Sequence, residues 1–390
     1  MTLNRGAQST KKGVVEGRKL RIGVTHFIRD GSQSIWENGI FQNCYFLLML
    51  LKKSPIVERC FVVNGGPGSA SDAVDFLKGT PAPVITMQDA MSELDVVIEL
   101  SAQLDPKWAQ EFKARGGTII GMHVASDYVI DCERMAFALP PTLLMAGGPY
   151  DEIWTLHAFE KTCRAYYETG FRAPVKVMQH LWNSEIVDRS ASDSGRVFAY
   201  QPGRTQWRLG VFEPNLCSVK TCHIPMLVSD LAYRKKSDAI EVMRVFNALQ
   251  LKEHGGFVAF ANSLDLVRCG KASFEGRYPI FEVLGVHCDA VISHHWENAQ
   301  NYLYYETLHA GFPIVHNSDL LGGCGYRYVD YDPEDGSFAL LQAFAEHDRN
   351  LSSYKRDAAE FLATLDPCAD ENVQSYTRAI DAIVERAHRS

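Results

Sequence analysis

From residue 19 onward the sequence repeats one rhythm: a short run of β-branched and apolar residues, a turn, and an amphipathic stretch of helical length. Strands that alternate with helices favour a parallel sheet with helices on both faces. The rhythm therefore predicts an α/β fold with doubly wound sheets. Strands are predicted over residues 20–27, 59–64, 94–100, 118–124, 152–157, 175–180, 208–212, 257–261, 290–295 and 313–317, and a helix over residues 238–251.

The rhythm is interrupted at residues 183–195 (NSEIVDRSASDSG), where Ser, Asp and Gly cluster as they do in linkers. A length of 390 residues suits two domains. We predict the first domain over residues 19–188 and the second over residues 196–366. Residues 1–18 are polar and basic, so they are expected to form a flexible tail, and residues 367–390 are predicted to form a final helix.

The charge balance argues against one class of partner. The chain carries 39 Lys and Arg residues against 47 Asp and Glu residues, which gives a net charge of −8. Such a chain has no overall attraction for a polyanion. A sequence-independent nucleic-acid binder is therefore not expected, although a local basic groove stays open.

The apolar runs and the cysteines indicate in which cellular compartment the chain is expected. The longest uninterrupted apolar run, residues 44–51 (CYFLLMLL), is less than half as long as a membrane span. The ten cysteines include no CxxC pair, which indicates buried thiols in a reducing compartment rather than a disulfide framework or a zinc module. We therefore expect no membrane span and a cytoplasmic location.

Three familiar motifs are missing from the sequence. No GxGxxG follows the first predicted strand, which argues against a dinucleotide dehydrogenase. No GxxxxGK[ST] is present, which excludes a P-loop NTPase, and no GxSxG nucleophile elbow is present either.

The most informative segment is residues 293–319 (SHHWENAQNYLYYETLHAGFPIVHNSD). A predicted strand ends at the two histidines, a polar loop follows, a helix carries Glu306, and Gly311-Phe-Pro313 turns into another strand. This order resembles the nucleotide-sugar site of the GT-B glycosyltransferases, and it fits a bacterial branch of them. The resemblance implies two Rossmann-like domains that face each other across a cleft, with the final helix packed back on the first domain.

The resemblance assigns roles to residues of this segment. In the family the helix carboxylate binds the ribose hydroxyls, which makes Glu306 the ribose carboxylate. The preceding loop and the helix N-terminus receive the diphosphate or the sugar, and unpaired N–H groups at a helix start do favour an anion. By this correspondence Glu297, Asn298, Asn301 and His294 contact phosphate or sugar.

One departure from the family pattern concerns stereochemistry. Retaining members have two glutamates separated by seven residues, whereas Glu297 and Glu306 are separated by eight, and Asn298 stands at the position of the first glutamate. The choice between retention and inversion at the anomeric carbon therefore stays open.

A cation is expected after the first strand of the second domain. In GT-B enzymes a loop at this point offers an Arg or Lys to the diphosphate, where it neutralises the charge that grows on the leaving group. Lys220 is the first candidate for this role and Arg204 the second. The alternative is that Lys220 is a solvated surface lysine.

The acceptor side is expected on the loop between the first strand and the first helix. GT-B enzymes place acceptor contacts there, with a general base in the inverting members, and Asp30, Glu37 and His26 are the local candidates for this base. Glu37 also fits a capping box with Ser34. The neighbouring Asn38 and Gly39 can direct backbone N–H groups towards phosphate.

A second candidate base is His123, which ends a predicted strand in the sequence GMHVASD. It is expected to contact the acceptor, to act as the base, or to be a satisfied core histidine. The predicted catalytic residues are therefore Asp30, His123 and Lys220.

No metal or other cofactor is predicted. His294, His295 and His316 lack the spacing of a zinc helix, and Asp330-Tyr-Asp332 matches a DxD metal motif in letters alone.

The resemblance implies a hexosyl- or pentosyltransferase that moves a sugar from a nucleotide-diphosphate sugar, its co-substrate, to an acceptor hydroxyl. A sugar-nucleotide 2-epimerase of the same fold, a non-catalytic nucleotide-sugar-binding protein and a DNA-modifying glycosyltransferase are the alternatives. The donor sugar, the acceptor (a saccharide, a lipid-linked molecule or a protein) and the oligomeric state stay open.

Overall fold

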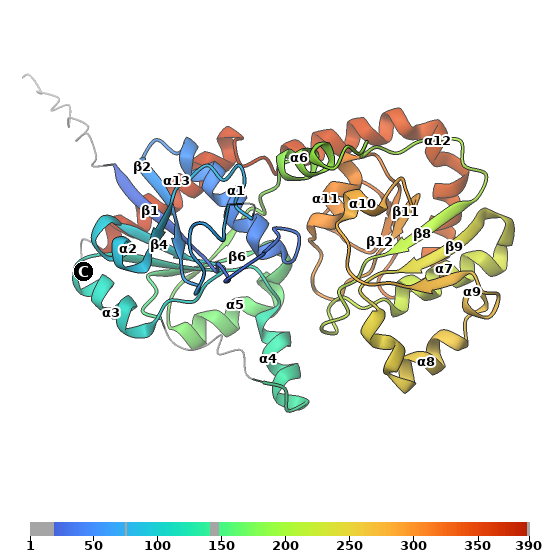
Figure 1. Cartoon of the computed structure of the whole chain (residues 1–390), viewed down its shortest axis with the longest axis horizontal. Coiled ribbons are helices and arrows are strands. Elements are labelled where there is room, and N and C mark those ends of the chain that lie inside the picture. The colour runs from blue at the N-terminus through green and yellow to red at the C-terminus, as the bar shows by residue number, and fades with distance from the viewer. Residues whose placement is uncertain (1–18, 75, 141–147, 388–390) are drawn as a thin grey trace, which may run out of the picture.

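The computed structural model describes residues 19–74, 76–140 and 148–387, and the tail predicted over residues 1–18 lies outside them. Two parallel sheets lie side by side, each with helices on both faces (Figure 1). This arrangement confirms the predicted α/β class with two doubly wound sheets. No helix in the described ranges is long and apolar enough to cross a membrane.

Seven strands form the N-terminal sheet, in the order β3-β2-β1-β4-β5-β6-β7. They are β1 (Leu20–His26), β2 (Val57–Asn64), β3 (Val84–Thr86), β4 (Val96–Glu99), β5 (Thr118–His123), β6 (Glu152–Leu156) and β7 (Val175–Met178). The helices between them are α1 (Gly39–Lys53), α2 (Met87–Glu93), α3 (Pro106–Ala114), α4 (Asp127–Ala136) and α5 (His157–Phe171). Helix α1 begins where the Asn38 side chain accepts a hydrogen bond from the Ile40 N–H, and it ends just before Pro55.

Six strands form the C-terminal sheet, in the order β10-β9-β8-β11-β12-β13. They are β8 (Trp207–Val211), β9 (Ile240–Val245), β10 (Ala272–Phe274), β11 (Ala290–Ile292), β12 (Ile314–His316) and β13 (Tyr326–Arg327). The helices of this half are α7 (His223–Lys235), α8 (Gly255–Asn262), α9 (Asp265–Arg268), α10 (Ile280–Val283), α11 (Tyr302–His309) and α12 (Pro333–Ala363). The strand order reverses between β8 and β11, and ligands of open α/β sheets bind at the carboxyl ends of strands that flank such a reversal.

Two predicted elements of this half are wrong. The helix predicted over residues 238–251 is instead strand β9 followed by a short 3₁₀ turn, because IEVMRV is a β-branched run that pairs with β8 on one side and β10 on the other. The strand predicted over residues 257–261 is instead helix α8, in which Phe257 and Ala261, four residues apart, are both buried.

The segment between the sheets is also more ordered than its polar composition predicted. Residues 183–195 contain helix α6 (Glu185–Asp193), whose buried face consists of Ile186, Val187 and Ala191. Spacing of one, four and five residues places these side chains on one face of the helix. The predicted linker is therefore largely a packed amphipathic helix.

The last helix, α13 (Asp370–Ala387), packs against the N-terminal sheet rather than against the domain that precedes it in sequence (Figure 1). Its Tyr376 hydroxyl donates to the Gln179 carbonyl at 2.7 Å, and the Tyr376 ring meets the Trp154 ring edge-on at 5.4 Å. Ile380 and Ile383 belong to the same buried cluster as the residues of α1. The chain thus returns to the first domain after completing the second.

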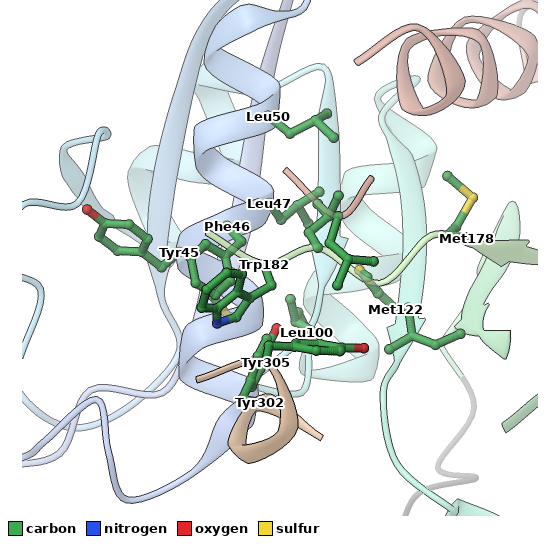
Figure 2. Close-up of a cluster of buried hydrophobic side chains, with 14 of the residues drawn as sticks. Tyr45, Phe46, Leu47, Leu50, Leu100, Met122, Met178, Trp182, Tyr302 and Tyr305 are labelled. Carbon is green, nitrogen blue, oxygen red and sulfur yellow. The ribbon is translucent and has the colours of Figure 1, made fainter. Parts of the chain in front are cut away.

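One apolar cluster joins the two domains. Figure 2 shows Tyr302 and Tyr305, from α11 of the second domain, next to Phe46 of α1 and Trp182. The Phe46 and Tyr302 ring centroids are 5.7 Å apart, and a side chain at Gly39 would place its Cβ 3.2 Å from the Tyr302 ring. Helices α1 and α11 therefore meet in a packed interface.

Candidate functional site

Buried polar atoms without a hydrogen-bond partner collect at the carboxyl ends of β8 and β11. Buried polar groups are almost always paired, so such a group of orphaned atoms indicates a place where a ligand or water binds. We call these residues, together with Lys220, the switch-point cluster. In the part of the chain that the structure describes, its orphaned atoms are Glu213 Oε2, His294 Nε2, His295 Nε2, Asn298 Oδ1 and Gln300 Oε1.

Lys220 is half-buried beside this cluster. Its Nζ donates to the Gln300 carbonyl at 3.1 Å. Burial lowers the pKa of the Lys220 ammonium from 10.5 to about 8, while the nearby Glu213 acts in the opposite direction. A partly desolvated ammonium of this kind interacts strongly with an anion that enters the site.

Glu213 follows β8 and is fully buried. One carboxylate oxygen accepts hydrogen bonds from the Ser293 hydroxyl and from the His294 N–H, and the other has no partner within the described residues. Burial raises the pKa of Glu213 from 4.5 to about 7. This residue connects the β8–α7 loop to the β11–α11 loop, and the sequence reasoning missed it.

Two of the predicted donor-site residues make contacts across the domain boundary. The Asn298 side-chain amide donates to the Ser126 hydroxyl at 3.1 Å, and Glu297 pairs with Lys161 of α5. A third contact joins the Ser218 N–H to the Glu133 carboxylate at 3.0 Å. The first domain thus closes over the β11–α11 loop.

Glu306 lies in the α1–α11 interface and is 4% exposed. Burial raises the pKa of its carboxyl from 4.5 to about 8, and a hydrogen bond from Gln42 of α1 acts in the opposite direction. The carboxyl is therefore protonated at neutral pH. Asn301 caps α11, because its side chain accepts from the Leu303 N–H at 3.3 Å.

Arg204 does not join the cluster. It pairs with Asp289 at 3.3 Å, and Asp289 stands directly before β11, at the amino edge of the sheet. Lys220 follows β8 and lies at the carboxyl edge. Arg204, the second candidate for the cation at the diphosphate, lies at the opposite edge of the sheet because it precedes β8.

His123 is held by a carboxylate. Its Nδ1 lies 2.8 Å from Asp127 Oδ2, which also accepts from the Tyr167 hydroxyl at 2.7 Å. In a neutral imidazole this contact places the ring hydrogen at Nδ1 and the lone pair at Nε2. His26, in contrast, is packed between Phe41 and Phe76, and burial lowers its pKa to about 3, as in a core histidine.

The candidate residues on the loop before α1 are either exposed to solvent or held in local contacts. Asp30 is exposed. Glu37 accepts from the Ser34 N–H at 3.1 Å and pairs with Arg29 at 2.8 Å. The Ser34–Glu37 pair therefore closes a turn and does not cap α1, whose cap is Asn38. Gly39 is the first residue of α1 and packs under Tyr302.

No metal centre is formed by the described side chains. Among residues 19–74, 76–140 and 148–387, no group of three or more His, Cys, Asp or Glu side chains is arranged to hold an ion. One member of the DxD-like pair has a structural role, because Asp332 caps α12 by accepting from the Glu334 N–H at 2.9 Å.

Comparison with known proteins places this geometry in context. A family model described as "Protein of unknown function (DUF2827)" matches residues 22–380. No curated protein matches the chain.

Several solved structures share the fold at low sequence identity. HepE of Anabaena, in complex with UDP-glucose, has a TM-score of 0.56 at 14% identity and covers 93% of this chain and 100% of its own. A mutant form of the Thermobaculum terrenum O-GlcNAc transferase has a TM-score of 0.55 at 12% identity, covering 95% of this chain and 68% of its own. The galactosyltransferase WaaB of the lipopolysaccharide outer core has a TM-score of 0.54 at 10% identity, covering 93% and 99%. The chain therefore has the GT-B fold, and it belongs to the DUF2827 family.

Proposed function

We propose that the protein is a glycosyltransferase that moves a sugar from a nucleotide-diphosphate sugar to an acceptor hydroxyl. The observation that carries this proposal is the switch-point cluster, a set of orphaned polar atoms around a desolvated lysine between two Rossmann-like domains. The similar fold of HepE in complex with UDP-glucose supports the substrate class.

The donor is held mainly by the second domain. The diphosphate binds at Lys220 and at the N-terminus of α11, where the first N–H groups of the helix have no carbonyl partner within the helix. The ribose hydroxyls bind at Glu306. Because this residue is enclosed between α1 and α11, donor binding requires these two helices to separate.

The acceptor is activated from the first domain. As the acceptor oxygen attacks the anomeric carbon, His123 Nε2 accepts its proton, and Asp127 stabilises the imidazolium that forms. The bond between the anomeric carbon and the diphosphate oxygen breaks, and its electron pair remains on the diphosphate, where Lys220 neutralises the charge. A base at this position favours inversion and needs no metal. Asp30 is the other candidate base.

Thermal unfolding of the full chain with UDP-, GDP-, dTDP- and CMP-sugars tests donor binding. A ligand at one hundred times its Kd stabilises the folded state by about 2.7 kcal/mol. We expect one nucleotide class to stabilise the wild type and Lys220→Met to lose that effect. Lys235→Met is the matched control, since Lys235 pairs with Glu334 on α12, away from the cluster. The proposal fails if no nucleotide sugar stabilises the wild type.

Turnover distinguishes the two candidate bases. His123→Gln should lower the rate of nucleoside diphosphate release by about 10²–10⁴-fold while donor binding persists. Loss of turnover in Asp30→Asn with full activity in His123→Gln would instead assign the base to Asp30.

A further inference from the structure

The C-terminal domain also contains a cavity of about 300 Å³ that has no role in the proposed reaction so far. It opens over β9, the β10–α10 loop and α10. Its lining includes Arg244, Phe246, Glu275, Tyr278, Glu282 and Arg196. A volume of this size is within the range of small-molecule sites, and the mixture of aromatic and charged side chains is typical of them.

The guanidinium group of Arg244 has only some of its hydrogen-bond donors paired in this cavity. Its Nε is buried and has no hydrogen-bond partner among the residues described. Its other contacts are long: Nη1 is 3.5 Å from the Ser273 hydroxyl and 3.9 Å from the Glu275 carboxylate. A guanidinium carries five donors in a fixed fork, so Arg244 retains the capacity to bind a planar acceptor pair.

Aromatic rings form one wall of the cavity. Phe246 stacks on Phe212 with ring centroids 4.6 Å apart and ring planes within 6° of parallel, so its position is fixed. Tyr278 meets Phe246 edge-on at 6.2 Å and is 51% exposed. An exposed tyrosine over a cavity offers a flat apolar face to a planar ligand.

The cavity is connected through the backbone to the loop that carries Lys220. Asn247, which follows Phe246, donates from its side chain to the Phe212 carbonyl at 2.9 Å. Its own carbonyl accepts from the Asn215 side chain at 3.2 Å. These contacts join the Phe246 end of the cavity to the β8–α7 loop, which carries Lys220. A nucleoside diphosphate carries its base at the end opposite the diphosphate, as a ligand of two such sites requires.

We infer that this cavity binds the nucleobase of the donor and that the base is guanine; this inference rests on the proposed function. Guanine presents two adjacent acceptors, N7 and O6, which an arginine binds bidentately. Next to them it presents the N1–H and N2–H₂ donors, which suit carboxylates. The cavity offers both kinds of group: Arg244 lies 3.9 Å from the Glu275 carboxylate, and Glu282 belongs to the same lining. Uracil, with one N–H between two carbonyl groups, leaves a carboxylate unpaired.

Calorimetric titration of the full chain with GDP, IDP and UDP tests the assignment, because IDP differs from GDP only in lacking the 2-amino group. We expect the order GDP, then IDP, then UDP in affinity, with GDP about tenfold or more tighter than UDP. Glu275→Gln and Glu282→Gln should reduce the preference for GDP over IDP. Arg244→Met should lower the affinity for both purine nucleotides. Glu241→Gln, a change at an exposed residue of β9, is the control and should behave as the wild type.

The outcomes separate the two proposals. If none of the tested nucleotides or nucleotide sugars binds the wild type, the proposed function is wrong. If UDP binds as tightly as GDP or tighter, the guanine assignment is wrong and the glycosyltransferase proposal stands. A preference for GDP that persists in all three cavity variants would show that another part of the chain recognises the base, and it would overturn the inference as well.

Discussion

The replacement Glu306→Gln tests whether the α1–α11 interface encloses a protonated carboxyl group. Burial raises the pKa of Glu306 from 4.5 to about 8, so between these values the folded chain holds a proton that the unfolded chain has released. The free energy of unfolding therefore decreases as pH rises through this window. From about pH 5 to about pH 7.5 the loss from this single group is about 3 kcal/mol.

Glutamine has nearly the same shape as glutamate and no titratable proton. The free energy of unfolding of the variant therefore lacks this pH-dependent decrease. The free energy of unfolding of Glu306→Gln, relative to the wild type, should rise by about 3 kcal/mol over the same pH interval. Urea titrations followed by tryptophan fluorescence at several pH values measure this difference. Glu334→Gln, at a residue whose side chain is 53% exposed, is the control and should follow the wild type. If the Glu306→Gln and wild-type profiles run parallel, the carboxyl is not enclosed as described and the reasoning fails.

Three further predictions concern the core, a loop contact and the site. Tyr376→Ala should lower the free energy of unfolding by about 3–5 kcal/mol, measured by urea titration, whereas Tyr376→Phe should lose only the hydrogen bond, about 1 kcal/mol. Gly66→Ala should destabilise by about 1–3 kcal/mol in the same titration because the new Cβ would overlap the Ile28 carbonyl oxygen; Gly255→Ala, with nothing within 4 Å, should not. The affinity for a nucleoside diphosphate should fall as pH rises through about 8, where Lys220 loses its proton; titrations at a series of pH values that show constant affinity would contradict this.

The sequence was sufficient for the architecture because strand and helix periodicity is local. Strand β5, for example, consists up to its last residue of apolar and β-branched residues buried on both faces, and such a run is typical of a parallel sheet. Periodicity failed for α8, because its short run FVAFA is apolar throughout and suits a strand as well as a buried helix.

The candidate site was predicted only where a residue matched a motif. Lys220 follows a strand and Glu306 occupies a recognised position on a helix, so both could be chosen as candidates from the sequence. Glu213 was missed because its significance depends on Ser293 and His294, about 80 residues later in sequence, which only the folded sheet brings to it. The Arg244 cavity was missed for the same reason, since its lining is drawn from separate segments of the chain.

The position of α13 has a consequence for biosynthesis. The helix that completes the N-terminal core is made after the second domain, so the apolar residues that Ile380 and Ile383 cover stay uncovered while that domain is made. Nascent chains with exposed apolar surface are prone to aggregate and are recognised by chaperones. A fragment that ends at the inter-domain helix would therefore lack the part that closes the core of the first domain.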